Sequence, residues 1–510
     1  MKKIIYILLL LPGSLLLNSC KDWLTVLPEN EQVSDEYWTS KEEVESVLSA
    51  GYVYLRDAVP QLIEWGELRA AGIYKLNEGS NLQTFQVTPD DEDICSWAPL
   101  YKVINMANSV LAHAEVVRER DETFEEAVMK SYMTEAYFLR ALAYFYIVRN
   151  WRDAPLILEP YETDAISYEK AKSTEQELLT QIKADITAAL ATGAAKEKFE
   201  EEWETKGRAT RWALNALLAD VCLWNEEYQA AVMACNEILD ATSAFRPVFV
   251  ADPAKWYEMF YPGNSNESIF ELQWDQKNYN QTNDLATIFG VSTPEYIYTD
   301  AMLLDFIRET GETGTNNAVR TLYGGFLPAT TDYTKAMTGF VWKYSGIGIQ
   351  GQVRNSTDED DPNFIIYRVA DVMLMKAEAM ILMSDSEEGW RTAFGLINKI
   401  RTRSRLPEVS PVLSEISQGD MLEYVLYERN MELAAEGKRW YDLLRFGRRN
   451  SFEYRERFLI NPVIAYNNTA NPSWVRSVLK NDDALFLPVW SSELMNNKLL
   501  EQNPYYGIVK

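Results

Sequence analysis

A pair of short helices joined by a tight turn is the feature of this sequence that most constrains the fold. Residues 209–224 carry apolar side chains at helical spacing, residues 225–227 are polar and interrupt the pattern, and residues 228–240 resume it. Small side chains recur along both segments, at Ala213, Ala216, Ala219, Ala231 and Ala234. Because alanines let two helix axes approach closely, this pattern predicts two antiparallel helices packed against each other.

The same arrangement recurs later in the chain. Residues 365–383 and 388–403 form a second predicted pair, and residues 419–436 with 438–449 form a third. Each pair resembles the helix–turn–helix unit of tetratricopeptide repeats, in which small residues lie where the helices cross. The sequence therefore predicts a mainly α fold with a scaffold of tetratricopeptide-like helical pairs.

Residues 243–360 differ in composition from the helical segments on either side. They are rich in Gly, Asn, Thr, Tyr and Pro, contain short β-like stretches, and show helical spacing only over 297–310. Long loops on a rigid scaffold usually carry function, so we expect this irregular, partly β insertion to form a ligand face. Residues 57–98 are predicted to be mostly loop and to contribute to that face. The flanking helical regions are 39–242 and 361–510.

The first twenty residues predict export and lipid attachment. Lys2 and Lys3 precede an apolar run that ends in small and polar residues before Cys20, which is the layout of a secretory signal peptide with a bacterial lipobox. We expect residues 1–19 to be removed, Cys20 to be lipidated, and residues 20–38 to form a tether. An uncleaved membrane helix is the alternative, but the run is shorter than the ~20 residues that a span needs.

Strong acidity narrows the range of partners. The chain has 76 Asp and Glu against 49 Lys and Arg, which gives a formal net charge of −27. Loss of Lys2 and Lys3 with the signal peptide lowers the 49 basic residues to 47 and the charge to −29. Nucleic acid repels such a chain, so we expect no nucleic-acid partner.

The few histidines and cysteines limit the catalytic mechanisms and metal sites that this chain can form. His113 is the single histidine, which excludes Ser-His-Asp and Cys-His catalysis elsewhere as well as multi-histidine metal sites. Cys222 and Cys235 lie on consecutive predicted helices and form either a disulfide or two buried thiols. No CxxC motif is present. The acidic residues 358–361 are a candidate calcium loop, but without EF-hand spacing a solvated loop or helix cap is favoured, and we expect no resident metal or cofactor.

Several stretches, in order and spacing, share the motifs of one protein family. They are the Cys20-Lys21-Asp22-Trp23-Leu24 start; EYWTSKEEVESVLSAGYVYL; Tyr101, Ile104, Ala107 and Asn108; EAYFLRALAYFYIVRNWRDAPLI; Arg368, Ala370, Asp371, Leu374, Ala377, Glu378 and Ala379; ERNMELAAEGKRWYDLLRFG; and LFLPVWSSELMNNKLLEQNPYY. Together they resemble the SusD/RagB family of Bacteroidota outer-membrane nutrient-binding lipoproteins. One departure is Arg152, where the family commonly has Gly before an Asp-x-Pro segment.

This resemblance implies a fold and a role. The fold is a SusD-like α-α superhelix with an irregular α/β ligand-binding region. The role is a non-catalytic, lipid-anchored protein on the cell-surface side of the outer membrane. Such proteins bind oligosaccharides and act as the lid of a SusC-like TonB-dependent transporter.

Candidate ligand-binding residues are aromatic and amide or carboxylate side chains. Sugar rings present C–H faces that stack on flat aromatic rings, while their hydroxyl groups need polar partners. Trp97 lies where the family often has a ligand-stacking aromatic, with a buried structural Trp as the alternative. The predicted ligand-binding residues are Trp97, Asn77, Asn81, Asp91, Trp274, Tyr279, Tyr296 and Trp342.

Three other functions remain open. The cargo is a peptide in the RagB branch of the family. A surface glycosidase would need two carboxyl groups roughly 5–10 Å apart across a cleft, and no pair stands out among so many acidic residues. A protein–protein scaffold would use the helical-repeat face alone.

A charged cluster near the C-terminus looks catalytic but is better explained as structural. Helical spacing brings carboxylates and guanidinium groups together, and such ion-pair networks perturb pKa values without catalysis. We expect the cluster to lock the last helices together. Its members are Glu428, Arg429, Glu432, Glu436, Arg439, Asp442 and Arg445.

Overall fold

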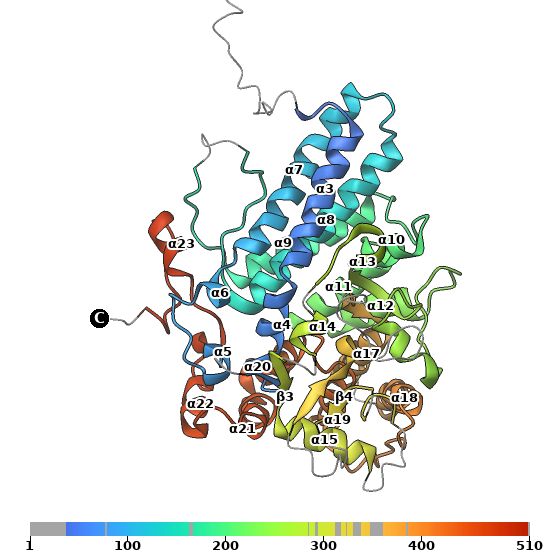
Figure 1. The fold of residues 1–510 in the computed structure, drawn as a ribbon, viewed down its shortest axis with the longest axis vertical. Coiled ribbons are helices and arrows are strands. Elements are labelled where there is room, and N and C mark those ends of the chain that lie inside the picture. The colour runs from blue at the N-terminus through green and yellow to red at the C-terminus, as the bar shows by residue number, and fades with distance from the viewer. Residues whose placement is uncertain are drawn as a thin grey trace, which may run out of the picture.

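A computed structural model gives the fold (Figure 1), and it describes residues 37–507 except 77–78, 163–166, 284, 291–293, 312–317, 323, 330–337, 347–360 and 384–385. The predicted signal peptide 1–19, Cys20 and most of the tether 20–38 lie outside the described residues. Asn77 and residues 358–360 of the candidate calcium loop lie outside them too. No helix within the described part of the chain is long and apolar enough to cross a membrane.

Long helices of the N-terminal half pack side by side (Figure 1). They are α3 (Lys41–Asp57), α7 (Ala98–Arg120), α8 (Glu126–Trp151) and α9 (Glu175–Ala191). Helix α8 has buried residues around most of its circumference, so it is the centre of this layer. Thr174 and Glu177 form a reciprocal capping box at the start of α9.

The predicted helical pairs are present, which confirms the mainly α class. The first is α11 (Arg211–Trp224) with α12 (Tyr228–Leu239), the second α17 (Val369–Met383) with α18 (Glu387–Arg403), and the third α19 (Gln418–Glu432) with α20 (Arg439–Phe452). Helix α12 packs against α17, which joins the first pair to the second. Cys222 and Cys235 are buried free thiols.

Two small antiparallel sheets lie against the helices. Strands β1 (Ile73–Lys75), β3 (Tyr296–Tyr298), β5 (Gly339–Val341) and β4 (Phe326–Pro328) form one sheet in that order, and β2 (Ser268–Leu272) pairs with β6 (Phe364–Arg368) in the other. Ile73 is opposite Tyr298, so a segment of the N-terminal half adds a strand to the irregular region.

The remaining elements are short, apart from α15. They are α4 (Val59–Glu67), α5 (Asn81–Thr84), α6 (Glu92–Cys95), α10 (Glu202–Gly207), α13 (Gln276–Tyr279), α14 (Leu285–Ile288), α15 (Asp300–Thr310), α16 (Trp342–Ser345), α21 (Asn461–Tyr466), α22 (Pro472–Leu479) and α23 (Ser491–Asn496), the π-helix Arg455–Ile460, and 3₁₀ turns at Pro253–Lys255, Tyr257–Met259 and Asp483–Leu485. Helix α4 packs against α20, so elements from near the two ends of the chain lie side by side (Figure 1).

Three local predictions were wrong. Residues 57–98 were expected to be mostly loop, but α4 is a helix, because Pro60 occupies its first turn and needs no backbone N–H there. The start of the 365–383 segment is strand β6, since its run of apolar and aromatic residues pairs with β2 before the helix begins. The helical spacing expected over 297–310 gives a helix only from Asp300, because Tyr296–Tyr298 is strand β3, which pairs with β1 and β5.

The charged C-terminal cluster is an ion-pair network, as predicted. Glu432 is buried and pairs with Arg368 at 2.7 Å and with Arg403 at 2.5 Å. These guanidinium groups hold the pKa of Glu432 below its usual range despite the burial that opposes them. Glu436 pairs with Lys343 at 2.7 Å. The network ties α19 and its following turn to β6, α16 and α18.

Arg152 has a backbone φ of 66°, in the left-handed region that favours glycine. Its side chain pairs with Asp153 at 3.0 Å and with Asp483 at 2.9 Å. The position where the family commonly has Gly therefore keeps a glycine-like turn in this chain.

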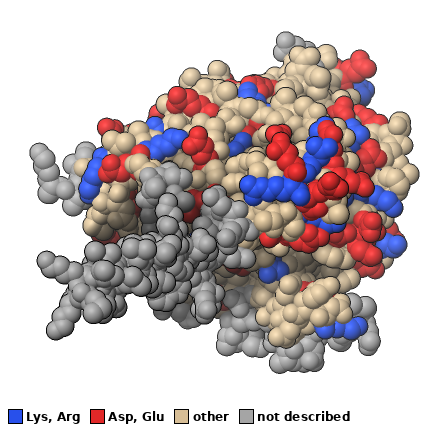
Figure 2. Space-filling view, turned by 90° about the horizontal axis from the view of Figure 1, so that it is seen from above, with Lys and Arg blue, Asp and Glu red and all other residues tan. Residues whose placement is uncertain are grey.

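Charges on the exposed surface are mixed. Figure 2 shows Asp and Glu interspersed with Lys and Arg over one face of the molecule. Such interspersed charges are typical of a solvent-exposed surface.

Candidate ligand-binding site

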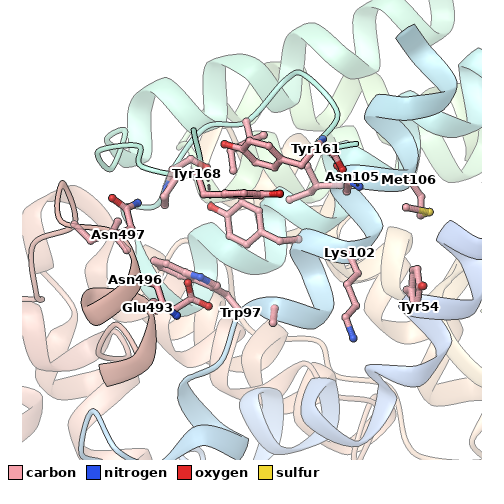
Figure 3. Close-up of a pocket in the computed structure, with 16 residues that line it drawn as sticks. Tyr54, Trp97, Lys102, Asn105, Met106, Tyr161, Tyr168, Glu493, Asn496 and Asn497 are labelled. Carbon is pink, nitrogen blue, oxygen red and sulfur yellow. Dashed lines mark hydrogen bonds between the residues drawn. The ribbon is translucent and has the colours of Figure 1, made fainter. Parts of the chain in front are cut away.

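A cavity of about 500 Å³ lies where α7, the segment after α8, and α23 meet (Figure 3). Its wall is mostly aromatic and apolar, with a few polar groups. The lining residues are Tyr54, Trp97, Ala98, Tyr101, Lys102, Ile104, Asn105, Met106, Pro155, Ile157, Tyr161, Tyr168, Glu493, Asn496, Asn497 and Leu500. An apolar cavity with a few converging polar groups is the common form of a small-ligand site.

Trp97 forms one end of the cavity. It is the N-cap residue of α7, and the following proline in the first turn starts the helix at this point. Its ring packs edge-on against Tyr101 at 5.7 Å and against Trp151 at 5.8 Å between centroids. Only 3% of Trp97 is exposed, so it forms the base of this end and presents little of its ring face.

Glu493 lies beside Trp97 and comes from α23 (Figure 3). Burial raises the pKa of this carboxyl, and a hydrogen bond from Trp97 partly opposes the rise. The C-terminal tail therefore places a partly desolvated hydrogen-bond acceptor next to the aromatic base.

Tyr161 and Tyr168 form the upper wall in Figure 3. Their ring centroids are 4.8 Å apart with the planes inclined by 36°, and Tyr168 is 54% exposed. The Asn105 side chain holds Tyr161, because it accepts from the Tyr161 backbone N–H at 2.7 Å and donates to its carbonyl at 3.3 Å. Tyr101 donates its hydroxyl to the Pro155 carbonyl at 2.6 Å. These hydrogen bonds hold the wall against α7. Tyr168 is the more exposed of the two tyrosines, so its ring is the one best placed to stack on a ligand.

The opposite end is more exposed. The Lys102 ammonium is 5.7 Å from the centroid of the Tyr54 ring. Met106 lies near them, on the next turn of α7 (Figure 3). This end therefore combines one aromatic ring with a solvent-accessible cation.

Of the sequence-predicted residues that the structure describes, Trp97 is the one that lines this cavity. Asn81 donates to the Asp91 carboxylate at 3.0 Å, and that carboxylate also accepts the Thr88 N–H at 2.7 Å, so both side chains stabilise a turn. Asn77 lies outside the described residues.

The aromatic residues predicted in the irregular region do not come together at the cavity. Tyr296 and Trp342 are each 4% exposed, and the Tyr296 hydroxyl donates to Glu64 at 2.5 Å. Trp274 is half-buried, with the Arg56 guanidinium 5.6 Å from its ring centroid. Tyr279 is 67% exposed on α13. Only Tyr279 offers an open ring, and it lies away from the cavity.

Sequence reasoning missed most of the cavity. Tyr161 and Tyr168 belong to a proline- and tyrosine-containing segment after α8, and that local clustering of tyrosines was the available signal. Glu493 and Asn496 lie in the C-terminal stretch that resembles the family's ending, and that resemblance does not mark either residue as a ligand contact. Among the residues that the structure describes, no group of His, Cys, Asp and Glu is arranged to hold a metal ion.

Comparisons with known proteins identify the family. The model of the SusD family matches residues 308–506, and a second model, described as starch-binding associating with outer membrane, matches residues 22–223. The SusD-like protein P38 of Formosa agariphila is 27% identical, over 96% of both chains. A SusD-like protein of Bacteroides ovatus is 24% identical over 94% of this chain and 87% of its own length. The chain belongs to the SusD/RagB family.

Solved structures share the fold. NanU of B. fragilis has a TM-score of 0.70 at 22% identity, covering 94% of this chain and 100% of its own. A laminarin-binding SusD-like protein has a TM-score of 0.69 at 20% identity, covering 92% of this chain and 100% of its own. The SusD-like architecture predicted from the sequence is therefore confirmed.

Proposed function

We propose that this chain is a non-catalytic glycan-binding lipoprotein of the outer membrane, which captures an oligosaccharide at the cell surface and delivers it to a SusC-like TonB-dependent transporter. The cavity beside Trp97 carries the proposal, because it combines open and buried aromatic rings with amide and carboxylate groups. That combination suits the apolar faces and hydroxyl groups of sugar rings. Membership of a family with a starch-binding description, and the laminarin-binding structural neighbour, support a glycan as cargo.

The single carboxylate in the cavity favours binding over hydrolysis. Glycosidases generally use a pair of carboxyl groups, and Glu493 is the one acidic side chain among the lining residues that the structure describes. The conspicuous acidic cluster, around Glu432, is occupied in buried ion pairs. Neither place offers a pair free to act on a substrate.

Lipidation of Cys20 would anchor the protein, with the tether leading to the described fold. Cys20→Ser, expressed in a Bacteroidota host, should move the protein from the membrane fraction to the medium or periplasm. Retention of the variant in the outer membrane would contradict the proposed anchor.

Binding is best tested with protein that begins at Lys21, by affinity electrophoresis and calorimetry against plant, microbial and host glycans. Tyr168→Ala removes the exposed ring and should weaken binding about tenfold or more, which corresponds to about 1.4 kcal/mol. Tyr279→Ala removes another exposed tyrosine ring, which lies away from the cavity, and serves as the matched control. Trp97→Ala should also lose binding, but its buried ring makes a loss of stability of about 3–5 kcal/mol expected as well.

Three results would contradict the proposal. Binding to peptides without any glycan would assign the chain to peptide uptake. Release of reducing ends from the bound glycan would show an enzyme. Equal binding by the parent protein and Tyr168→Ala, with a loss in Tyr279→Ala, would move the site to α13.

A further inference from the structure

The cavity holds two charged side chains at opposite ends, and neither has an ion-pair partner among the residues that the structure describes. Glu493 lies at the Trp97 end, and Lys102 lies at the Tyr54 end (Figure 3). The other lining residues are uncharged. A ligand therefore meets a carboxylate at one end and an ammonium group at the other.

The two charges differ in their exposure to solvent. Lys102 is exposed, so water and salt weaken its attraction for a bound anion. Glu493 is half-buried, and burial raises the pKa of its carboxyl. Charge interactions are stronger where the surroundings exclude water. The field felt by a ligand at the aromatic base is thus dominated by the carboxylate.

The Glu493 carboxylate also keeps acceptor capacity for a ligand. A carboxylate has about four acceptor positions, and the hydrogen bond from Trp97 uses one of them. Sugar hydroxyl groups can donate to the others, and hydrogen bonds to an ionised acceptor are stronger than neutral ones. A sugar carboxylate or sulfate in the same place offers only acceptors and a like charge.

We propose that Glu493 makes this cavity select uncharged sugar units at the Trp97 end and reject units that carry a carboxylate or sulfate. The inference rests on the proposed function and narrows its ligand to neutral glycans. Lys102 plays no part in the selection, because its ammonium group is at the exposed end.

The test starts from whichever glycan the protein captures. That glycan is converted to two derivatives with the same degree of substitution, hydroxyethyl and carboxymethyl, which are similar in size and differ in charge. Calorimetry should show the hydroxyethyl form binding at least about tenfold more tightly than the carboxymethyl form. In Glu493→Gln, which keeps the shape of the side chain, the ratio should fall below about threefold. Glu501→Gln, an exposed acid outside the cavity, should keep the ratio of the parent protein.

Each of the other outcomes would overturn either this inference or the proposed function. An unchanged ratio in Glu493→Gln, with the native fold retained by circular dichroism, would overturn the inference and leave glycan capture intact. The inference would also be overturned, with glycan capture intact, if the captured glycan is itself acidic and binds as tightly as its carboxyl-reduced or desulfated form. A preference for the carboxymethyl form that disappears in Lys102→Gln would assign the dominant field to the ammonium group instead. Failure of every glycan to bind would refute the proposed function itself.

Discussion

Two glycine-to-alanine substitutions should have opposite effects on stability: Gly66→Ala, at a buried helix contact, should destabilise the protein, and Gly395→Ala, on an exposed helix face, should stabilise it. Gly66 lies in α4, and a Cβ atom added there would lie 2.0 Å from the carbonyl oxygen of Gly437 and 2.3 Å from its carbonyl carbon. Cβ atoms essentially never approach other atoms closer than 3.0 Å, so the two backbones would have to separate. Gly395 in α18 is exposed, and a Cβ atom there would meet nothing within 4 Å.

The Gly437 backbone has little freedom to move. Its φ of +70° is in the left-handed region, and its N–H donates to the buried Glu67 carboxylate at 2.8 Å. The same carboxylate oxygen accepts the Lys438 N–H at 3.2 Å. Separation of α4 from this turn would therefore relieve the clash but stretch both hydrogen bonds, of which the one from Gly437 is buried.

The magnitudes follow from these contacts. Overpacking of a close-packed interior costs about 1–3 kcal/mol, and we take the upper end for Gly66→Ala because backbone atoms cannot rotate away. Alanine gains about 1 kcal/mol over glycine in a helix interior. Gly66→Ala should therefore lower the free energy of unfolding by about 2 kcal/mol, whereas Gly395→Ala should raise it by up to about 1 kcal/mol.

Chemical denaturation followed by far-ultraviolet circular dichroism, with thermal midpoints as a second readout, measures both effects. A Gly66→Ala protein as stable as the parent would show that α4 and the turn at Gly437 do not touch as described. A loss of stability in Gly395→Ala similar to that in Gly66→Ala would show that the effect is not specific to the close approach.

Two further perturbations test the buried charges. Burial raises the pKa of Glu67 from 4.5 to about 7, so folding favours the protonated carboxyl group. The contribution of Glu67 to the free energy of unfolding therefore declines as pH rises from 4.5 to 7. In urea denaturation, Glu67→Gln should be more stable than the parent protein at pH 8 by up to about 3 kcal/mol and should lose that advantage near pH 4. Arg368→Met leaves Glu432 and its neighbours with uncompensated buried charge and should lower the free energy of unfolding by about 3–5 kcal/mol. As a control, Arg391→Met removes an exposed ion pair with Glu387 and should change the free energy of unfolding by less than about 1 kcal/mol in the same assay.

Helices with strong apolar periodicity could be predicted from the sequence. The predicted pair 209–224 and 228–240 matches α11 and α12 closely, because a polar turn separates two runs with unambiguous helical spacing. Helix α4 could not be predicted in the same way, because Pro60 and Gly66 interrupt the local helical pattern. Pro60 suits a first turn, and Gly66 is explained by a contact with residue 437 that no local pattern reveals.

The cavity was harder to predict because its wall is assembled from segments far apart in the sequence. Trp97 was found through the motif that follows it on α7. Tyr168 comes from a segment packed against that helix, and Glu493 comes from α23. Neither residue has a periodic or spacing signal, because only tertiary contacts bring it to the cavity.

The arrangement links the stability of the scaffold to the placement of the ligand site. Helix α4 is held against the C-terminal turn at Gly437, and Arg69, four residues after Trp65, donates to the Leu485 carbonyl at 2.8 Å. The indole of Trp65 packs edge-on against Trp151, and Trp151 donates to the Pro488 carbonyl at 3.0 Å. These contacts fix the tail just before α23, so they set where Glu493 meets Trp97. The family motifs therefore hold the cavity in place, and some motif residues, such as Tyr101 and Glu493, also line it. The motifs identify the fold but do not mark which of their side chains face the cavity, which explains why they predict the fold well and the ligand contacts poorly.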